Sequence, residues 1–426
     1  MRAYFIRRLL LILPTLLGIT VLVFLITRLV PGGPVERMMS EMRRGGDGAA
    51  RGAAAGQNMA LSEENIEQLK EHFALDKPMV QSYLIWLGVW PREDFKKRIE
   101  FAPGVTELPI RSSRSREKLV VHRDGENRFR VLRPDGSSAA PWKVRGLGYR
   151  KPDSNASADE AAKVERAEVF RPGFSGVLTG DFGLSYRYND PVVAVIAERL
   201  PVSTYYGLMT LLLTYLISIP LGIIKATQHK TWFDNFSSAI IFAGYAIPSY
   251  ALGAILVTWL AVHLGWFPAG GFTSFDFLDK STSGKVWDIL YHSILPLTCY
   301  VIGHFAFLTM LMKNQLMDNL AADYIRTAVA KGMPYEQAVR KHALRNAFIP
   351  IATHLGNAVS LFVAGSFLIE RIFDIDGFGL LGFDSIVDRD YPVVMGVVFL
   401  TSFLLLAGNV VSDLLVALVD PRVRFT

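Results

Sequence analysis

The sequence has a single cysteine, Cys299, so no disulfide can form within the chain. It also lacks the phosphate-binding pattern G-x4-G-K-S/T of nucleotide hydrolases. Gly284-Lys285 is followed by Val286 and has no glycine at the required upstream position. HExxH and GxSxG are absent, and the eight histidines are scattered. We therefore expect a chain that is not an enzyme, with no catalytic residue, no metal site and no cofactor of its own.

Charged residues make up 20% of the chain, yet they are nearly missing from several long stretches. Hydrophobic residues make up 51% and gather in those stretches. A helix needs about 20 apolar residues to cross the roughly 30 Å hydrocarbon core of a bilayer. We predict an all-α integral membrane protein with six spanning helices, at about 9–30, 203–224, 237–263, 289–312, 347–369 and 392–416.

The N-terminus raises the alternative of a cleaved signal peptide, because Arg2, Arg7 and Arg8 precede an apolar run. That run is longer than the apolar part of a signal peptide. It ends in Arg28 and Pro31–Pro34 without a small-x-small cleavage site. We therefore predict a retained first helix.

The orientation follows from the tendency of Lys and Arg to collect in short cytoplasmic loops. With the N-terminus inside, the short inner segments hold thirteen of these residues and the short outer loops hold four. We predict that both termini are cytoplasmic.

This topology divides the chain into four parts. They are a tail with the first helix at 1–30, an exported region at 31–200, a membrane core at 201–416 that includes a cytoplasmic loop at 313–346, and a cytoplasmic tail at 417–426.

Within the exported region, residues from about 91 to 172 are polar and basic, and we expect a small α+β insertion there. Residues 118–122 and 128–133 alternate in character around Asp124-Gly125, which favours a β-hairpin. Ser157–Val169 fits a polar helix. The insertion is either a separately packed subdomain or a partly disordered segment.

Four other patterns lie outside the membrane. Residues 45–56 have the composition of a linker, residues 61–75 and 79–90 fit short amphipathic helices, and residues 370–391 are glycine-rich, which favours tight reversals.

The cytoplasmic loop at 313–346 is too long for a simple connection and keeps a helical composition throughout. Lys331–Pro334 predicts a break between two helices, since Gly332 can end one helix in the left-handed conformation and Pro334 suits the first turn of the next. The second helix carries a semi-apolar stripe formed by Tyr335, Ala338, Val339 and His342. Such a helix can lie on lipid, pack on its own bundle or dock in a groove of a partner.

Two segments of this loop resemble the EAA loop of binding-protein-dependent ABC importer permeases, in the form found in dipeptide and oligopeptide permeases. They are Tyr324–Gly332 (YIRTAVAKG) and Arg340–Ala347 (RKHALRNA). The match departs from the pattern in two ways, because it lacks Glu-Ala-Ala and has Val329 where arginine is common.

Further blocks spread the resemblance over most of the chain, and the Yej-type B subunits are the most similar within the family. The blocks are Tyr4–Leu9 through Pro31–Pro34, Gly180–Ser185, Pro191-Val192, Arg199–Pro201, Ser218–Gly222, Gly244–Pro248, Thr309–Leu311, Ile369–Leu381, Arg389–Val393 and Asp420–Arg424. In the family, the segment matching Trp86–Trp90 runs almost directly into Gly180-Asp181. The insertion at 91–172 is therefore a departure.

The resemblance implies a six-helix type I ABC importer permease of a bacterial inner membrane, forming half of a translocation pathway for oligopeptides or modified peptides. It implies a second homologous permease subunit, one fused or two separate ATPase subunits that bind ATP and Mg, and a periplasmic peptide-binding protein, with no nucleic acid. The cytoplasmic loop then provides a coupling helix for the ATPase, and the expected coupling residues are Ala328, Lys331, Gly332, Tyr335, Val339, His342 and Arg345.

Polar residues within predicted spans are costly in lipid and indicate a pathway or a helix contact. His304 suits a hydrogen bond to a neighbouring helix better than a substrate contact. Asn357 and Ser360 share one helix face, and they either line the pathway or serve packing. Glu370 and Asp413 lie near span ends where water can reach them, so we expect structural roles.

Two other classes of membrane protein compete with the permease. An ion-coupled secondary transporter would show inverted repeats and charged pairs at mid-membrane, and the sequence shows neither. A membrane-anchored sensor with an exported domain at 31–200 would not need five further spans.

Overall fold

The computed structural model describes residues 2–29, 77–102, 104–111, 117–125, 128–149 and 164–419, without the side chains at 94–95, at 356–364 and at a few positions near both termini. The chain separates into two compact units. One unit consists of residues up to 56 and from 184 onward, and the other consists of residues 57–183. The predicted linker at 45–56 and helix at 61–75 fall outside the described ranges.

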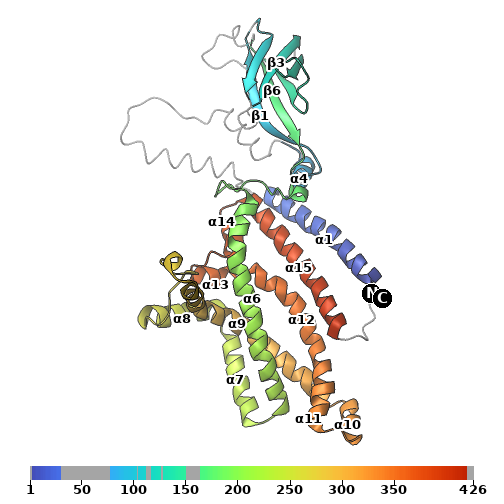
Figure 1. The fold of residues 1–426 in the computed structure, drawn as a ribbon, viewed down its shortest axis with the longest axis vertical. Helices are drawn as coiled ribbons and strands as arrows, with labels where there is room; N and C mark the ends of the chain where they lie inside the picture. The colour runs from blue at the N-terminus through green and yellow to red at the C-terminus, as the bar shows by residue number, and fades with distance from the viewer. Residues whose placement is uncertain are drawn as a thin grey trace. The chain divides into compact units, whose positions relative to one another are not determined.

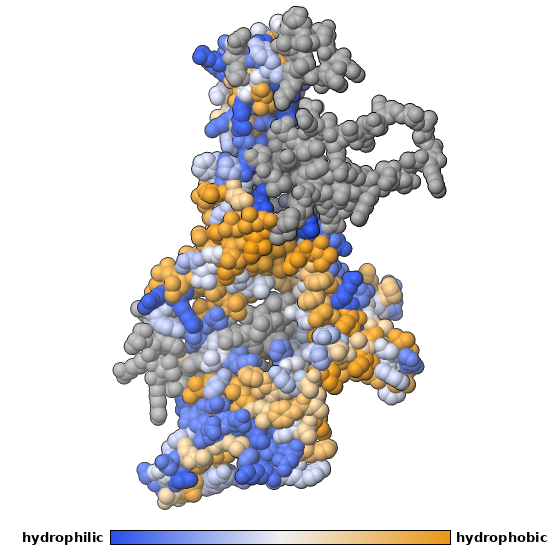
Figure 2. Space-filling view, turned by 180° about the vertical axis from the view of Figure 1, so that it is seen from behind, coloured by the Kyte–Doolittle hydropathy of each residue, from blue (hydrophilic) through white to orange (hydrophobic). Residues whose placement is uncertain are grey.

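Four helices in the described part of the chain are long and apolar enough to cross a bilayer. They are α1 (Arg2–Leu29), α6 (Val192–Thr227), α9 (Thr282–Leu320) and α15 (Tyr391–Val419). Helix α1 contacts α15, and α6 contacts α9 along much of their length (Figure 1). Figure 2 shows broad hydrophobic areas on the surface of this helical unit, as lipid contact requires.

The span predicted at 237–263 is not one straight helix. Helix α7 (Trp232–Ala246) and helix α8 (Ser249–Leu256), which continues as the π-helix η2 (Val257–His263), meet at an angle of 90°. Pro248 causes the break, because its ring forces Ile247 into the extended region (φ −86°, ψ 122°).

The predicted count of six spans is not confirmed. The described residues contain four long apolar helices and this one bent pair. The predicted span at 347–369 falls mostly on α12 (Leu344–Ala364), which contains Pro350.

Close packing joins α6 and α9 over the inner half of the unit. A Cβ added at Gly222 would lie 2.7 Å from the Cβ of Met312, so only glycine permits this approach. Small residues serve this purpose widely between membrane helices. Polar contacts join the second pair of helices, α1 and α15. Asp413 on α15 forms an ion pair with Arg8 on α1 and accepts a hydrogen bond from the Tyr4 hydroxyl (2.9 Å).

The glycine-rich segment at 370–391 contains two helices rather than only tight reversals. They are α13 (Phe367–Ile372) and α14 (Phe378–Val387). Gly377 serves as the N-cap of α14, and the glycines at 379 and 382 lie inside it. A turn at 373–377, in which Asp374 has φ +50°, separates the two helices, and the buried side chains of Phe378, Leu380 and Leu381 stabilise α14 despite its glycines.

The unit of residues 57–183 contains two three-stranded antiparallel sheets, in the orders β1-β6-β5 and β2-β3-β4. The strands are β1 (Arg92–Phe101), β2 (Glu107–Arg111), β3 (Lys118–Gly125), β4 (Arg128–Leu132), β5 (Lys143–Tyr149) and β6 (Glu165–Gly173). A helix, α4 (Met79–Leu87), and a 3-10 turn, η1 (Val177–Thr179), complete its described part.

The predicted hairpin is confirmed, since β3 pairs antiparallel with β4 from Val120 opposite Leu132 to Gly125 opposite Arg128, with one register shift between Arg123 and Gly125. The predicted helix at Ser157–Val169 is wrong where it is described, because β6 occupies residues 165–169. Ala167 and Val169 point into the core with the two-residue period of a strand. Residues 157–163 of that helix are not among those described.

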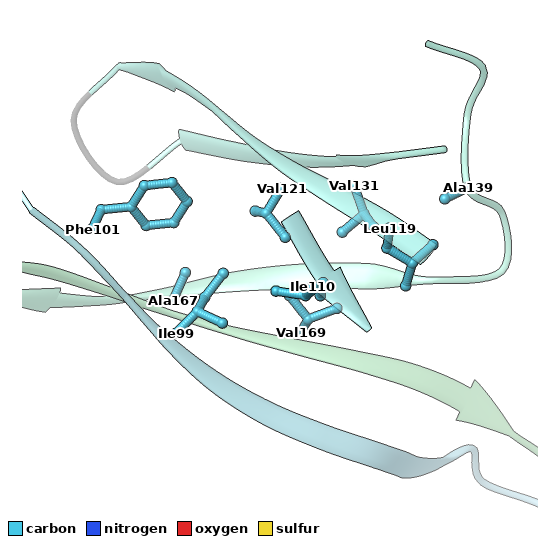
Figure 3. Packing of buried hydrophobic residues seen from close by; sticks show 9 residues of the cluster. All are labelled: Ile99, Phe101, Ile110, Leu119, Val121, Val131, Ala139, Ala167 and Val169. Carbon is cyan, nitrogen blue, oxygen red and sulfur yellow. The ribbon is translucent and has the colours of Figure 1, made fainter. Parts of the chain in front are cut away.

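One hydrophobic core stabilises this unit (Figure 3). Phe101 on β1 and Val121 on β3 are fully buried, so both sheets contribute to it. The other buried members are Ile99, Ile110, Leu119, Val131, Ala139, Ala167 and Val169.

A charge cluster on the same unit centres on Glu93. Burial alone would raise the pKa of Glu93, but hydrogen bonds from Arg145 and Lys96 and the charge of Lys77 lower it to about 2. Because this folded pKa lies below the usual value of 4.5, the stabilisation is complete above pH 4.5 and is lost as the pH falls toward 2.

Replacing Phe101 with alanine should destabilise this unit by about 3–5 kcal/mol, because it removes a fully buried aromatic ring from a core of nine residues. Hydrogen exchange of the full-length protein in detergent tests this. A loss of about 3 kcal/mol corresponds to roughly 150-fold faster exchange of β3 and β6 amides that open with the unit. Val105→Ala, in the turn after β1, is the matched control. Equal exchange in both variants would contradict the assignment of the core.

Candidate functional site

In the loop at 313–346, α9 continues to Leu320, and the next helix is α10 (Asp323–Ala330), which ends at Lys331. Gly332 has φ +90°, and its N–H donates to the Val329 carbonyl (2.9 Å), while the Met333 N–H donates to the Ala328 carbonyl (3.2 Å). These two hydrogen bonds form a Schellman motif, which requires the left-handed residue that glycine tolerates. The predicted break at 331–334 is confirmed.

The second helix begins after Pro334 as α11 (Tyr335–Ala338), widens into the π-helix η4 (Val339–Ala343) and continues as α12. Within the predicted stripe, Ala338 and Val339 are buried, whereas Tyr335 is 56% exposed. Ala343 rather than His342 continues the buried face, and His342 is half-buried. The prediction assumed a regular helix, whereas a π turn holds an extra residue and shifts the buried face by one position.

The buried face of the loop packs on the chain's own helices. Ala338, Ala343 and Ala347 share one hydrophobic cluster with the inner end of α9, which contributes Met312 and Leu316. Of the three alternatives for this helix, packing on its own bundle explains the buried side.

The opposite side of the loop remains exposed, and we name it the inner loop face. Arg345 is exposed and Ala328 is half-buried, whereas Val339 belongs to the buried side. The exposed residues that form the inner loop face are Tyr324, Arg326, Thr327, Val329, Lys331, Gly332 and Tyr335.

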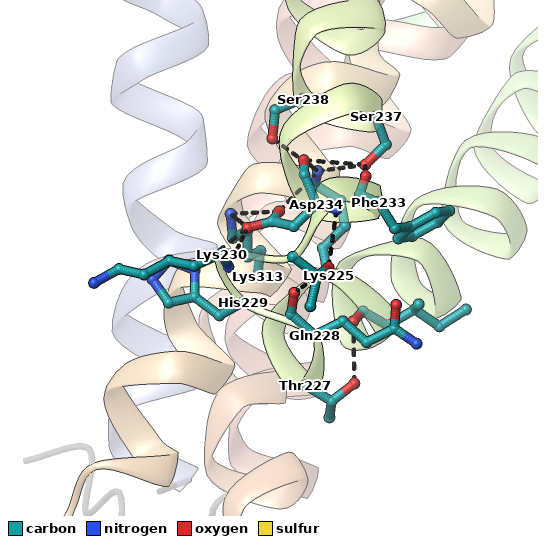
Figure 4. A network of polar contacts seen from close by, with 12 residues as sticks. Lys225, Thr227, Gln228, His229, Lys230, Phe233, Asp234, Ser237, Ser238 and Lys313 are labelled. Carbon is teal, nitrogen blue, oxygen red and sulfur yellow. Dashed lines mark hydrogen bonds and ion pairs between the residues drawn. The ribbon is translucent and has the colours of Figure 1, made fainter.

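A buried ionic network lies at the same end of the helices (Figure 4). The Asp234 carboxylate on α7 accepts hydrogen bonds from Lys313 on α9 at 2.7 and 2.8 Å, and lies 3.0 Å from the Lys225 ammonium on α6. Lys225 also donates to the hydroxyls of Ser237 (2.7 Å) and Ser238 (2.8 Å).

The three charged residues are almost completely buried: Lys225 is 0%, Asp234 2% and Lys313 7% exposed. Burying ions is costly unless they are paired and hydrogen-bonded. Here one carboxylate bridges two ammonium groups that come from different helices. The network therefore ties α6, α7 and α9 together beside the loop at 313–346.

Farther along α9 the helical unit forms a partly open cavity of about 290 Å³. Helix α6 contributes Thr210 and α9 contributes Tyr300 and His304. The remaining lining residues are small or polar, apart from one isoleucine: Gly207, Ser249, Cys299, Gly303, Gly365, Ser366 and Ile369. A buried hydroxyl at Thr210 has no hydrogen-bond partner among the described residues, which suits a cavity that receives polar ligands.

His304 is thus the one predicted pathway residue that the structure places at this cavity. Asn357 and Ser360 lie in α12, but their side chains are outside the described part of the structure, so their role stays a prediction.

Glu370 connects the cavity wall to helix α14. Its carboxylate accepts hydrogen bonds from the Leu380 N–H (2.5 Å), in the first turn of α14, and from the Tyr300 hydroxyl (3.5 Å). A Cβ at Gly365 or Gly377 would overlap this carboxylate. The expectation that water reaches Glu370 is wrong, since the residue is 1% exposed and the two glycines let the backbone close around it.

Comparison with known proteins connects these features to a family. The family model described as "Binding-protein-dependent transport system inner membrane component" matches residues 218–425. The peptidoglycan transport system permease YejB of Agrobacterium fabrum is 32% identical over 100% of this chain and 99% of its own length. The inner membrane ABC transporter permease YejB of Escherichia coli O157:H7 shows the same identity and coverage. The oligopeptide transport system permease AppB of Bacillus subtilis is 30% identical over the full length of both chains.

The chain belongs to this family of inner-membrane permeases. Its members are permease subunits of ABC transporters that work with a substrate-binding protein, and ATP hydrolysis takes place on a partner subunit. A solved inward-facing MetNI methionine transporter matches 54% of this permease and 97% of its own chain, with 17% identity and a TM-score of 0.40.

Three residues of the permease that lie beside its cytoplasmic loop were missed by sequence reasoning. They are Lys225, Asp234 and Lys313. A signal for them exists, since Lys225 and Lys313 are the first residues after predicted apolar spans. Their pairing could not be predicted, because residues 79 positions apart come together only when α7 packs on α9.

Asp234→Asn should destabilise the permease by about 3–5 kcal/mol, because it leaves two buried ammonium groups without a counter-charge. Thermal unfolding in detergent measures the loss. Asp279→Asn, in the exposed turn η3 (Phe277–Asp279), removes a carboxylate of the same type and should leave the unfolding temperature unchanged. Equal melting of both variants would show that the network contributes no stability.

Proposed function

We propose that this permease imports peptides, either oligopeptides or modified peptides, as one half of a transmembrane pathway. Its full-length likeness to permeases named for oligopeptide and peptidoglycan transport is the observation that carries this proposal. A dipeptide permease of Lactococcus lactis, 33% identical over 58% of this chain, adds to the same substrate class. A second homologous permease subunit completes the pathway in this proposal.

The inner loop face is the proposed contact for the ATPase, which binds ATP and Mg. Its support is mechanical, because the opposite side of the loop is packed against Met312 and Leu316 of α9. The same helix reaches the cavity at His304, about 24 Å from its inner end at Leu320 for a rise of 1.5 Å per residue. A push on the loop therefore moves the cavity wall.

The topology follows from this assignment. The inner loop face and both termini lie on the cytoplasmic side, and residues 31–200 lie on the exported side, toward the periplasmic peptide-binding protein. The excess of Lys and Arg in the short inner segments supports this orientation.

Transport by reconstituted proteoliposomes tests the function. The permease is co-reconstituted with its second permease subunit, the ATPase and the binding protein, and uptake of labelled oligopeptides is compared with uptake of labelled peptidoglycan fragments. We expect uptake that requires both ATP and the ATPase. Uptake without the ATPase, or uptake of neither substrate, would overturn the proposal.

Gly332→Val should uncouple ATP hydrolysis from transport while the complex still assembles, because a β-branched residue resists φ +90° and disrupts the Schellman motif. A Cβ at this position meets no atom within 4 Å, so the effect is conformational and not steric. Gly332→Asn is the matched control, since asparagine tolerates this conformation. The ratio of ATP hydrolysed to peptide imported should rise in the valine variant alone. A normal ratio of ATP hydrolysed to peptide imported in the valine variant would show that transport does not depend on the left-handed conformation at Gly332.

Cys299 offers a probe of the pathway without any substitution, because it is fully buried and lines the cavity. A membrane-impermeant maleimide applied from outside should react slowly in the resting complex. Reaction should accelerate when ATP and loaded binding protein are both present, since the cavity then opens outward. A Cys299→Ser variant defines the background, and equal labelling in both states would place the pathway elsewhere.

A further inference from the structure

Large exposed apolar side chains gather in one part of the 57–183 unit. Nine such side chains are exposed among its described residues, and three of them, Val105, Leu147 and Tyr149, lie in the β-sheet region. The other six lie on helix α4 with the two residues beyond Gly88, and on the segment around η1. We name this surface the α4–η1 base; it consists of Met79, Val80, Val89, Trp90, Phe174 and Leu178.

The base is a preformed surface. Helix α4 ends at Gly88, which has φ +91° and donates its N–H to the carbonyls of Leu84 and Ile85. Gly176, directly before η1, packs on this turn so closely that an added Cβ would lie 2.6 Å from the Trp86 carbonyl oxygen. Ile85 on α4 and Val177 on η1 are buried inside the unit. The exposed apolar side chains of the same two elements are therefore held outward.

The composition of the base is that of a membrane interface. Trp90 is exposed beside Val89, and tryptophan is enriched where hydrocarbon meets headgroups. Arg92 follows Trp90 by two residues and Arg171 precedes Phe174 by three, whereas Lys77, next to the start of α4, is paired with Glu93 (3.5 Å). Long basic side chains that flank apolar residues reach lipid phosphates while their neighbours enter the hydrocarbon boundary.

The chain confines this base to the neighbourhood of the bilayer. Leu184 forms a β-bridge with Pro191, directly before α6. With 36 residues, α6 is roughly 54 Å long, whereas a bilayer with its headgroups measures about 40–45 Å. The start of α6 therefore lies within roughly 10 Å of the headgroups. From Leu184 the chain back to Thr179 spans at most about 18 Å.

We propose that the α4–η1 base docks on the outer surface of the same membrane, with its apolar side chains at the headgroup boundary and Arg92 and Arg171 near lipid phosphates. The occupant is lipid, because the tether holds the base at high effective concentration next to the bilayer, where even weak intrinsic affinity suffices. Docking fixes the orientation of the β-sheets on the membrane. The proposal requires that α6 spans the bilayer, and it does not depend on the transported substrate.

Site-directed fluorescence of the assembled transporter tests this. Leu178→Cys is labelled with an environment-sensitive fluorophore, and the buried Cys299 contributes little background. The complex is placed in nanodiscs of phosphatidylethanolamine and phosphatidylglycerol, with or without lipids that carry a nitroxide at the headgroup. Leu147→Cys on β5 of the same unit is the matched control.

We expect severalfold stronger nitroxide quenching at position 178 than at position 147, and loss of that difference in the Val80→Asp background. Equal quenching at the two positions would overturn the proposal. Weak quenching at position 178 together with cross-linking to the second permease subunit or the binding protein would overturn it in favour of a protein contact. Peptide uptake by the same preparations is scored separately, so failure of docking and failure of transport are distinguished.

Discussion

Backbone hydrogen bonding in hydrocarbon is the constraint on which the helical unit depends. Water is absent there, so a spanning segment must satisfy its own N–H and C=O groups, and breaks are tolerated only where protein or a cavity surrounds them. The unit breaks its helices at Ile247-Pro248 and at Gly365-Ser366, and residues next to both breaks line the same cavity. The Ser366 N–H donates to the Tyr300 hydroxyl (3.2 Å), so the cavity wall replaces a helical partner. The irregular backbone and the candidate pathway are therefore one feature.

Rigidity at the inner end follows from two kinds of contact that act on the same helices. Gly222 lets α6 approach Met312 of α9, and the Asp234 carboxylate joins lysines of both helices to α7. The buried alanines of α11, η4 and α12 pack on this assembly. The buried side of the loop therefore shares one hydrophobic core with α9. The opposite end of the helices is organised differently: Glu370 links α13, α14 and Tyr300 through hydrogen bonds in a space that only glycine leaves open.

The two sheets of the 57–183 unit bury a compact hydrophobic core, and they neutralise buried carboxylates by ion pairs such as Arg123 with Glu165 (2.7 Å). Its β-hairpin was readable from alternation around Asp124-Gly125. Strand β6 could not be predicted in this way, because Glu165 and Glu168 by themselves suggest a polar helix. Their partners, Arg123 on β3 and Arg98 on β1, are supplied only by the folded structure.

The sequence alone determined the membrane character, the helix break at Gly332 and the family, because apolar length, glycine conformation and motif order are local properties of the chain. Tertiary structure decided what depends on distant neighbours. Pro248 bends a span that was predicted to be straight, and a π turn moves the buried face of the loop from His342 to Ala343. Glu370 is buried in the structure, although the sequence suggested that solvent reaches it. The network of Lys225, Asp234 and Lys313 and the cavity at Tyr300 belong to the same class. Their residues lie far apart in sequence, and only helix packing brings them within hydrogen-bonding distance.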